Sequence, residues 1–159
     1  MIKLHYLDAN CLVKLVIEES RSNQLRNYFF QTGVVCASTT FCFYEALGVL
    51  KCKWANQKRP DHISSEQYFS ACQDLCAMVE DGIIQLDEIP LADRATFNEA
   101  ERIAASHKID LSDALQLITL KRGMFARLDA GEPILVSEDG KLLKAAREQK
   151  LKAMDIDSL

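Results

Sequence analysis

Short apolar runs alternate along the chain with longer segments in which apolar residues recur every three or four positions. The short runs predict strands at Lys3 to Leu7, Val34 to Ala37, Ile83 to Leu86, Ile134 to Val136 and Lys152 to Ile156. The longer segments between them predict helices. Strands that alternate with helices are typical of an α/β fold, so the pattern predicts a parallel, doubly wound sheet.

Several of the longer segments also carry signals for the start and end of a helix. Ser64 can cap a helix whose apolar stripe continues to Val79, and Gly82 can end it. Further helices are predicted from about Asp93 to His107, from Ser112 to about Arg122 and from about Asp139 to Gln149. No linker is long enough to separate two domains, so residues 1–159 are predicted to form one domain.

The composition narrows the class of protein. Of the 159 residues, 48% are hydrophobic, which is enough for a substantial core. Lys and Arg number 19 against 23 Asp and Glu, and the formal net charge of −4 does not suit a polycation that coats nucleic acid. Any contact with nucleic acid is therefore expected to be local.

The chain shows no sign of a membrane span or a secretion signal. The longest uncharged stretch, from Asn27 to Tyr44, is too polar to cross a bilayer, and Asp8 and Lys14 interrupt the apolar residues near the N-terminus. The six cysteines are expected to be reduced thiols, and Cys72 and Cys76 lack the second ligand pair of a zinc site. These features predict a cytoplasmic protein.

Candidate chemistry comes from acids placed after the predicted strands. In an open parallel sheet, ligands bind beyond the carboxyl ends of the strands. Asp8 directly follows the first strand, and Ser137 and Asp139 follow the fourth. Two carboxylates from distant parts of the sequence are therefore expected at the same edge of the sheet.

Two further acids stand out because their surroundings are apolar. Glu45 is the only acid in the run from Phe41 to Leu50, and Asp113 lies in the first turn of an apolar helix that Asp110 precedes. Each acid also has an ordinary interpretation. Asp110, Asp113 and Asp139 could cap helices, Asp8 could be a turn residue, and Glu45 could face solvent.

Several carboxylates at one edge repel one another unless a cation neutralises them or one of them takes up a proton. An all-oxygen set suits Mg²⁺ or Mn²⁺. Such a metal can polarise a phosphoryl oxygen and lower the pKa of a water, which fits hydrolysis of a phosphodiester. The glycines form no Walker loop, G-x-S-x-G turn or dinucleotide-binding motif.

Four sequence segments carry a family resemblance, and together they run from one end of the chain to the other. They are YLDANCLVKLVIEE, FYEALGVL, SDALQL and ILVSEDGKLLKAAREQKLKAMDI. In these segments the chain resembles the PIN-domain nucleases, especially the VapC-type toxins of bacterial toxin–antitoxin pairs. The acidic metal-binding residues of that family fall on Asp8, Glu45, Asp113 and Asp139, the residues that the topology also selects.

The resemblance implies a three-layer α/β/α fold with five parallel strands, a homodimer, Mg²⁺- or Mn²⁺-dependent cleavage of RNA, and inhibition by a cognate antitoxin protein. Ser137 stands where the family more often has Thr, and Asn10 where Ser or Thr is common. Both keep a hydrogen-bonding group and could orient the acids or a water, as groups around a metal site commonly do. The alternative is that both only stabilise turns.

A basic stretch supplies the candidate RNA contacts. Phosphates attract Lys and Arg, and an exposed Trp could stack on an unpaired base. An ordinary solvated helix end, with the Trp packed inward, is the other interpretation. The candidate residues are Lys51, Lys53, Trp54, Lys58 and Arg59.

The leading hypothesis is a metal-dependent endoribonuclease, the toxin of a toxin–antitoxin pair. A first alternative is a PIN-like module without catalysis that binds RNA or protein. A second is a phosphatase with Asp8 as nucleophile, although such enzymes place another Asp two residues on, where this chain has Asn10.

Overall fold

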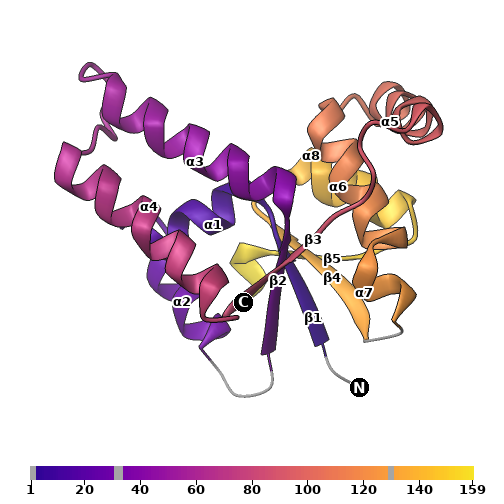
Figure 1. The fold of residues 1–159 in the computed structure, drawn as a ribbon, viewed down its shortest axis with the longest axis horizontal. Coiled ribbons are helices and arrows are strands. Elements are labelled where there is room, and N and C mark those ends of the chain that lie inside the picture. The colour runs from indigo at the N-terminus through magenta and orange to yellow at the C-terminus, as the bar shows by residue number, and fades with distance from the viewer. Residues whose placement is uncertain (1–2, 31–33, 129–130) are drawn as a thin grey trace.

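A sheet of five parallel strands forms the centre of the molecule (Figure 1). The computed structural model describes residues 3–30, 34–128 and 131–159. The strands are β1 (Lys3–Leu7), β2 (Val34–Thr39), β3 (Ile84–Asp87), β4 (Glu132–Ser137) and β5 (Lys152–Asp155). They lie in the order β3-β2-β1-β4-β5, and every neighbouring pair is parallel. The predicted parallel sheet is confirmed, with strand boundaries that differ from the predicted ones by at most two residues.

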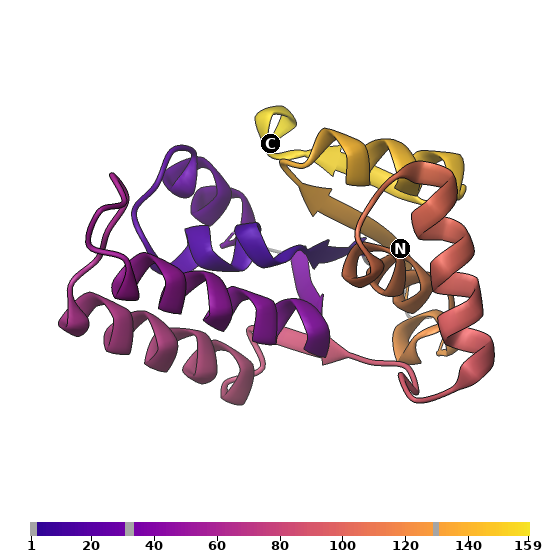
Figure 2. The same ribbon diagram turned by 90° about the horizontal axis from the view of Figure 1, so that it is seen from above.

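Helices cover both faces of the sheet, which gives the predicted three layers (Figure 2). One face carries α1 (Ala9–Val16), α2 (Ser22–Phe29), α3 (Thr40–Ala55) and α4 (Ser65–Glu80). The other carries α5 (Arg94–His107), α6 (Leu111–Arg122), α7 (Met124–Arg127) and α8 (Gly140–Glu148). A short 3-10 helix, η1 (Ile156–Ser158), follows β5.

The two hydrophobic cores follow from the alternation of side chains along the strands. Successive residues of a strand point to opposite faces of a sheet. In β1, Tyr6 packs into the core under α5–α8, whereas Leu7 packs into the core under α1–α4. In β4, Leu135 and Val136 divide in the same way. Because both faces are buried, the central strands β1 and β4 read as mainly apolar runs rather than as a polar–apolar alternation.

The helix starts match the signals in the sequence. Ser64 and Gln67 form a reciprocal capping box at the start of α4, and the Asp93 carboxylate accepts the Thr96 N–H at 2.9 Å at the start of α5. Asp139 caps α8 in the same manner. Asp110 also precedes a helix, but its side chain makes no capping hydrogen bond.

Helices α3 and α4 run side by side and extend away from the sheet as a helical arm (Figure 1). The indole of Trp54 stacks on Tyr68, with ring centroids 4.7 Å apart and ring planes 3° from parallel. Its Nε1–H donates to Ser65 Oγ at 2.9 Å. The outer end of the arm is thus closed by an aromatic pair.

Within the ranges that the structure describes, no helix is long and apolar enough to cross a bilayer. All six cysteines are free thiols, of which Cys11, Cys36 and Cys42 are buried.

Candidate active site at the carboxyl edge of the sheet

The strand order reverses between β1 and β4. The chain passes from β1 to β2 and β3 on one side, and it places β4 and β5 on the other side. Ligands of open α/β sheets bind at such a reversal, beyond the carboxyl ends of the strands. Leu7 of β1 pairs with Val136 of β4 in the register of the sheet. Asp8 and Ser137 follow these two residues in the sequence, so they lie at the same level at the carboxyl edge.

Asp8 is buried and held at both carboxylate oxygens. Oδ1 accepts the Cys11 backbone N–H at 2.8 Å, and Oδ2 accepts the Ser137 hydroxyl. Ser137 Oγ in turn accepts the backbone N–H of Asp139 at 2.9 Å. Burial raises the pKa of Asp8, and the hydrogen bonds from Ser137 and Cys11 partly oppose that rise. Ser137 therefore bridges the Asp8 carboxylate and the backbone N–H of Asp139, and its predicted role in orienting a metal site stays a prediction.

Asp113 and Glu45 face the same region from two helices. Burial raises the pKa of Asp113 to about 6, and the negative charges of Asp139, Glu45 and Asp110 add to this rise. Loss of solvation also raises the pKa of Glu45, with contributions from Asp8 and Asp110. The acids lie close enough to repel one another, so a cation placed among them would stabilise their charged forms.

Asp110 belongs to this group, although the sequence analysis considered it only as a helix cap. Its side chain makes no capping bond, and its charge acts on both Glu45 and Asp113. The signal in the sequence was its spacing, because residues three apart lie on the same side of a helix start. We call the set Asp8, Glu45, Asp110, Asp113 and Asp139 the acidic edge.

The donor chemistry of the acidic edge suits a hard divalent cation, but the acids do not form a closed cage. Within residues 3–30, 34–128 and 131–159, no group of three or more His, Cys, Asp or Glu lies close enough to hold a metal ion. Asp139 also uses Oδ1 to accept the Lys141 and Leu142 backbone N–H groups. Mg²⁺ rests on one or two protein carboxylates and keeps several waters, so the arrangement fits binding partly through water.

Asn10 lies exposed in the first turn of α1, close to Asp8 in the sequence. No side-chain hydrogen bond involving Asn10 occurs within the described part of the chain. Its predicted role in orienting Asp8 or a water remains a prediction.

The candidate RNA-binding stretch requires a correction. Lys53 is only 6% exposed, and its ammonium group forms ion pairs with Glu19 and, at 2.5 Å, with Asp61. Arg59 also pairs with Asp61, at 2.7 Å. Lys53 is therefore not available to a phosphate, whereas Arg59 is exposed but already paired with an acid of this chain.

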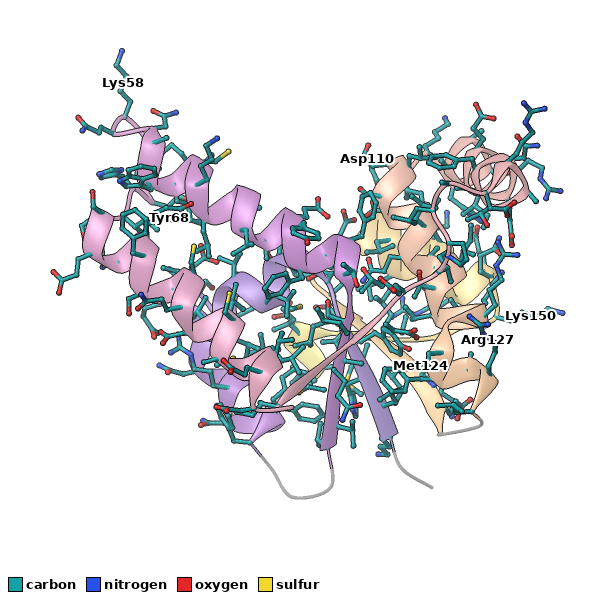
Figure 3. The ribbon with its side chains drawn as sticks, viewed as in Figure 1. Lys58, Tyr68, Asp110, Met124, Arg127 and Lys150 are labelled. Carbon is teal, nitrogen blue, oxygen red and sulfur yellow. The ribbon has the colours of Figure 1, made fainter. Side chains whose placement is uncertain are left out.

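The rest of the basic stretch lies on the helical arm. Lys51 and Lys58 are exposed, whereas Trp54 is half-buried against Tyr68. Figure 3 places Lys58 at the outer end of the arm, on the opposite side of the view from Asp110. Lys58 therefore lies far from the acidic edge.

A second buried acid, Asp87, ends β3 and serves the packing of α7. It accepts the Tyr6 hydroxyl at 2.5 Å, the Met124 N–H at 2.7 Å and the Glu88 N–H at 2.8 Å. A Cβ at Gly123 would lie 2.3 Å from Asp87 Oδ2, so only glycine fits there. Sequence analysis overlooked Asp87, although it follows a predicted strand as Asp8 does.

Comparison with protein-family models and with curated proteins found no match. Among solved structures, the chain is similar to the crystal structure of PAE2754 from Pyrobaculum aerophilum, with a TM-score of 0.57 and 18% sequence identity. The match covers 99% of this chain and 92% of that chain. At this identity the likeness concerns the fold, and it agrees with the parallel sheet and its two helical layers.

The raised pKa of Asp113 predicts a pH-dependent gain of stability when its charge is removed. The folded protein binds this proton more tightly than the unfolded chain, whose ordinary pKa is 3.8. Stability linked to this proton is present below that pH and is lost as the pH rises through about 6. In EDTA at neutral pH, Asp113→Asn should therefore raise the free energy of unfolding by roughly 1 kcal/mol.

Urea unfolding at two pH values measures this effect. At a pH below 3.8 the variant and the wild type should be equally stable, because Asp113 is then protonated in both states. Asp74→Asn, at an exposed position of α4, is the control and should change stability at neither pH. Equal stability of wild type and Asp113→Asn at neutral pH would contradict the repulsion argued for the acidic edge.

Proposed function

We propose that the chain is a divalent-metal-dependent endoribonuclease that cleaves RNA phosphodiester bonds at the acidic edge. The observation that carries this proposal is the convergence of acids from α3, α6 and the ends of β1 and β4, whose negative charges add to the raised pKa of Glu45 and Asp113. The resemblance of the sequence to the PIN-domain nucleases selects four of the same acids.

The residues of this chain would fix the geometry of the reaction. Ser137 and the Cys11 N–H hold the Asp8 carboxylate at the end of β1. Asp113 and Glu45 present further oxygens from the helices on either side. When bound there, Mg²⁺ or Mn²⁺ supplies a Lewis acid for the phosphoryl oxygens and lowers the pKa of a water.

The proposal includes the toxin role of the VapC-type proteins, with an antitoxin and a second copy of the chain as partners. Its support is a set of exposed aromatic side chains on the helical arm, of which Tyr44 is 68% and Phe69 56% exposed. Exposed apolar groups of this size mark protein interaction surfaces. A strictly monomeric protein that binds no antitoxin would count against this part.

A module that binds RNA or protein without catalysis is the second candidate. The observation that favours it is the open arrangement of the acids, since no three of them lie together as metal ligands in the described residues. A phosphatase with Asp8 as nucleophile is a further alternative, which a screen of small phosphate esters distinguishes from a ribonuclease.

Incubation of the purified protein with mixed cellular RNA tests the proposal. With Mn²⁺ or Mg²⁺ we expect discrete cuts that leave 5′-phosphate and 3′-hydroxyl ends, and with EDTA we expect none. Mapping of the RNA ends provides the measurement. Binding of RNA without any cut under all metal conditions would favour the second candidate.

A further inference from the structure

A hollow of about 370 Å³ opens between the end of α5 and the helix α8. Its lining includes Lys108, Lys141 and Lys144, together with His107 and Glu148. All three lysines are exposed. Three lysines against a single acid make this hollow positive, on a chain whose net charge is negative.

The one acid in the hollow is already engaged. Glu148 Oε2 lies 2.8 Å from His107 Nδ1, and Glu148 Oε1 lies 3.8 Å from the Lys144 ammonium group. Lys108 and Lys141 take part in no ion pair within the described part of the chain. Their ammonium groups can therefore meet an anion without first breaking an internal contact.

The hollow borders the acidic edge on two sides. Lys108 ends α5 in the left-handed conformation, with φ 55°, and stands two residues before Asp110. Lys141 lies in the first turn of α8, two residues after Asp139. Two residues of chain span at most about 7 Å. Figure 1 shows α5, α6 and α8 on the same side of the molecule, and Figure 3 places Asp110 at the start of α6.

We infer that this hollow, which we call the lysine groove, holds the sugar–phosphate backbone of a single-stranded RNA and leads it to the acidic edge. The inference rests on the proposed function and adds the path of the substrate. Lysines neutralise phosphates as point charges, and contacts to phosphates carry no sequence information, so the groove binds the backbone whatever the sequence. The attraction between these lysines and the phosphates offsets the repulsion that the acidic edge exerts on RNA.

Anisotropy of a fluorescein-labelled single-stranded RNA of mixed sequence, measured in EDTA, tests the inference because the RNA stays uncut. The double variant Lys108→Gln with Lys141→Gln should bind about tenfold more weakly than the wild type at low salt. Loss of two phosphate contacts should also reduce the slope of log affinity against log salt by about 1.4. The matched control, Lys3→Gln with Lys150→Gln at exposed positions outside the groove lining, should bind like the wild type.

Because all four lysines are exposed, both double variants should keep the wild-type melting temperature, which confirms that they fold. If the groove variant binds like the wild type, or if the wild type does not bind, the inference is overturned. Cleavage assays on the same proteins keep the two proposals apart. RNA that is cut equally by wild type and groove variant overturns the groove alone, whereas groove-dependent binding without any cleavage overturns the nuclease alone.

Discussion

Replacement of Asp8 by Asn is expected to reduce metal-dependent RNA cleavage by at least about a hundredfold, the scale of losing one preorganised electrostatic group in an active site. Asp8 is the acid that the fold fixes most firmly, since both of its oxygens accept hydrogen bonds where the strand order reverses between β1 and β4. An amide removes the negative charge to which the proposal assigns attraction of the metal. The measurement is the rate of cleavage of the mapped RNA under saturating Mg²⁺ or Mn²⁺.

The fold should survive this change because Asn has nearly the same shape as Asp. The amide oxygen can still accept the Cys11 N–H, and the amide N–H₂ can donate to Ser137 Oγ. Circular dichroism and a melting curve should therefore show a folded variant. Full cleavage activity in a folded Asp8→Asn protein would contradict the assignment of Asp8 to the active site.

Asp87→Asn is the matched control, since Asp87 is also a buried acid at the end of a strand. Its partners are the Tyr6 hydroxyl and the Met124 N–H rather than other acids. We expect this variant to lose roughly 1–3 kcal/mol of stability and to keep its cleavage rate at temperatures where it is folded. Equal loss of cleavage in both variants would indicate a general effect of removing a buried acid.

Glu19→Ala is expected to destabilise the protein by about 3 kcal/mol, because it leaves two nearly buried lysines short of a counter-charge. Glu19 accepts an ion pair from Lys53 and another, at 3.2 Å, from Lys14. Burial alone would raise the pKa of Glu19, but the two lysines hold it below its ordinary value. Lys14 keeps Glu138 and Lys53 keeps Asp61, so the loss is partial rather than complete.

The neighbouring Glu18→Ala provides the control for this prediction. Glu18 is exposed and pairs only at the surface with Arg26, at 2.6 Å. Exposed pairs contribute roughly 0–1 kcal/mol. Chemical unfolding of the two variants should therefore separate them clearly, and similar small losses in both would show that the charges around Glu19 are well solvated.

The strands and the position of Asp8 follow from local sequence, because an apolar run and the polar residue that ends it are adjacent in the chain. The shift of β3 has an equally local cause. Gly82 turns the chain with φ +71°, and Ile83 stays exposed in the bend instead of entering the sheet. Asp87 then becomes the last residue of the strand.

Other features depend on contacts that no local pattern reveals. Lys53 looked free because its own segment contains no acid, but its partner Glu19 comes from the loop after α1. The spacing of Asp110 and Asp113 is a local signal, but the effect of Asp110 on Glu45 joins two segments that are distant in the sequence. The lysine groove joins the end of α5 to α8, so its charge is divided between two segments that each look ordinary alone.

The contact of Asp87 with Tyr6 and Gly123 has a consequence for the divergence of related sequences. If Asp8 and Asp113 serve the proposed cleavage, a related sequence without that activity is free to vary them, but the packing still requires Asp87 and a glycine at position 123. Substitutions at Asp8 and at Asp87, the two buried aspartates, should therefore occur independently of each other among related sequences. A related sequence that retains Asp87 and Gly123 but has lost Asp8 would keep the fold without the proposed activity.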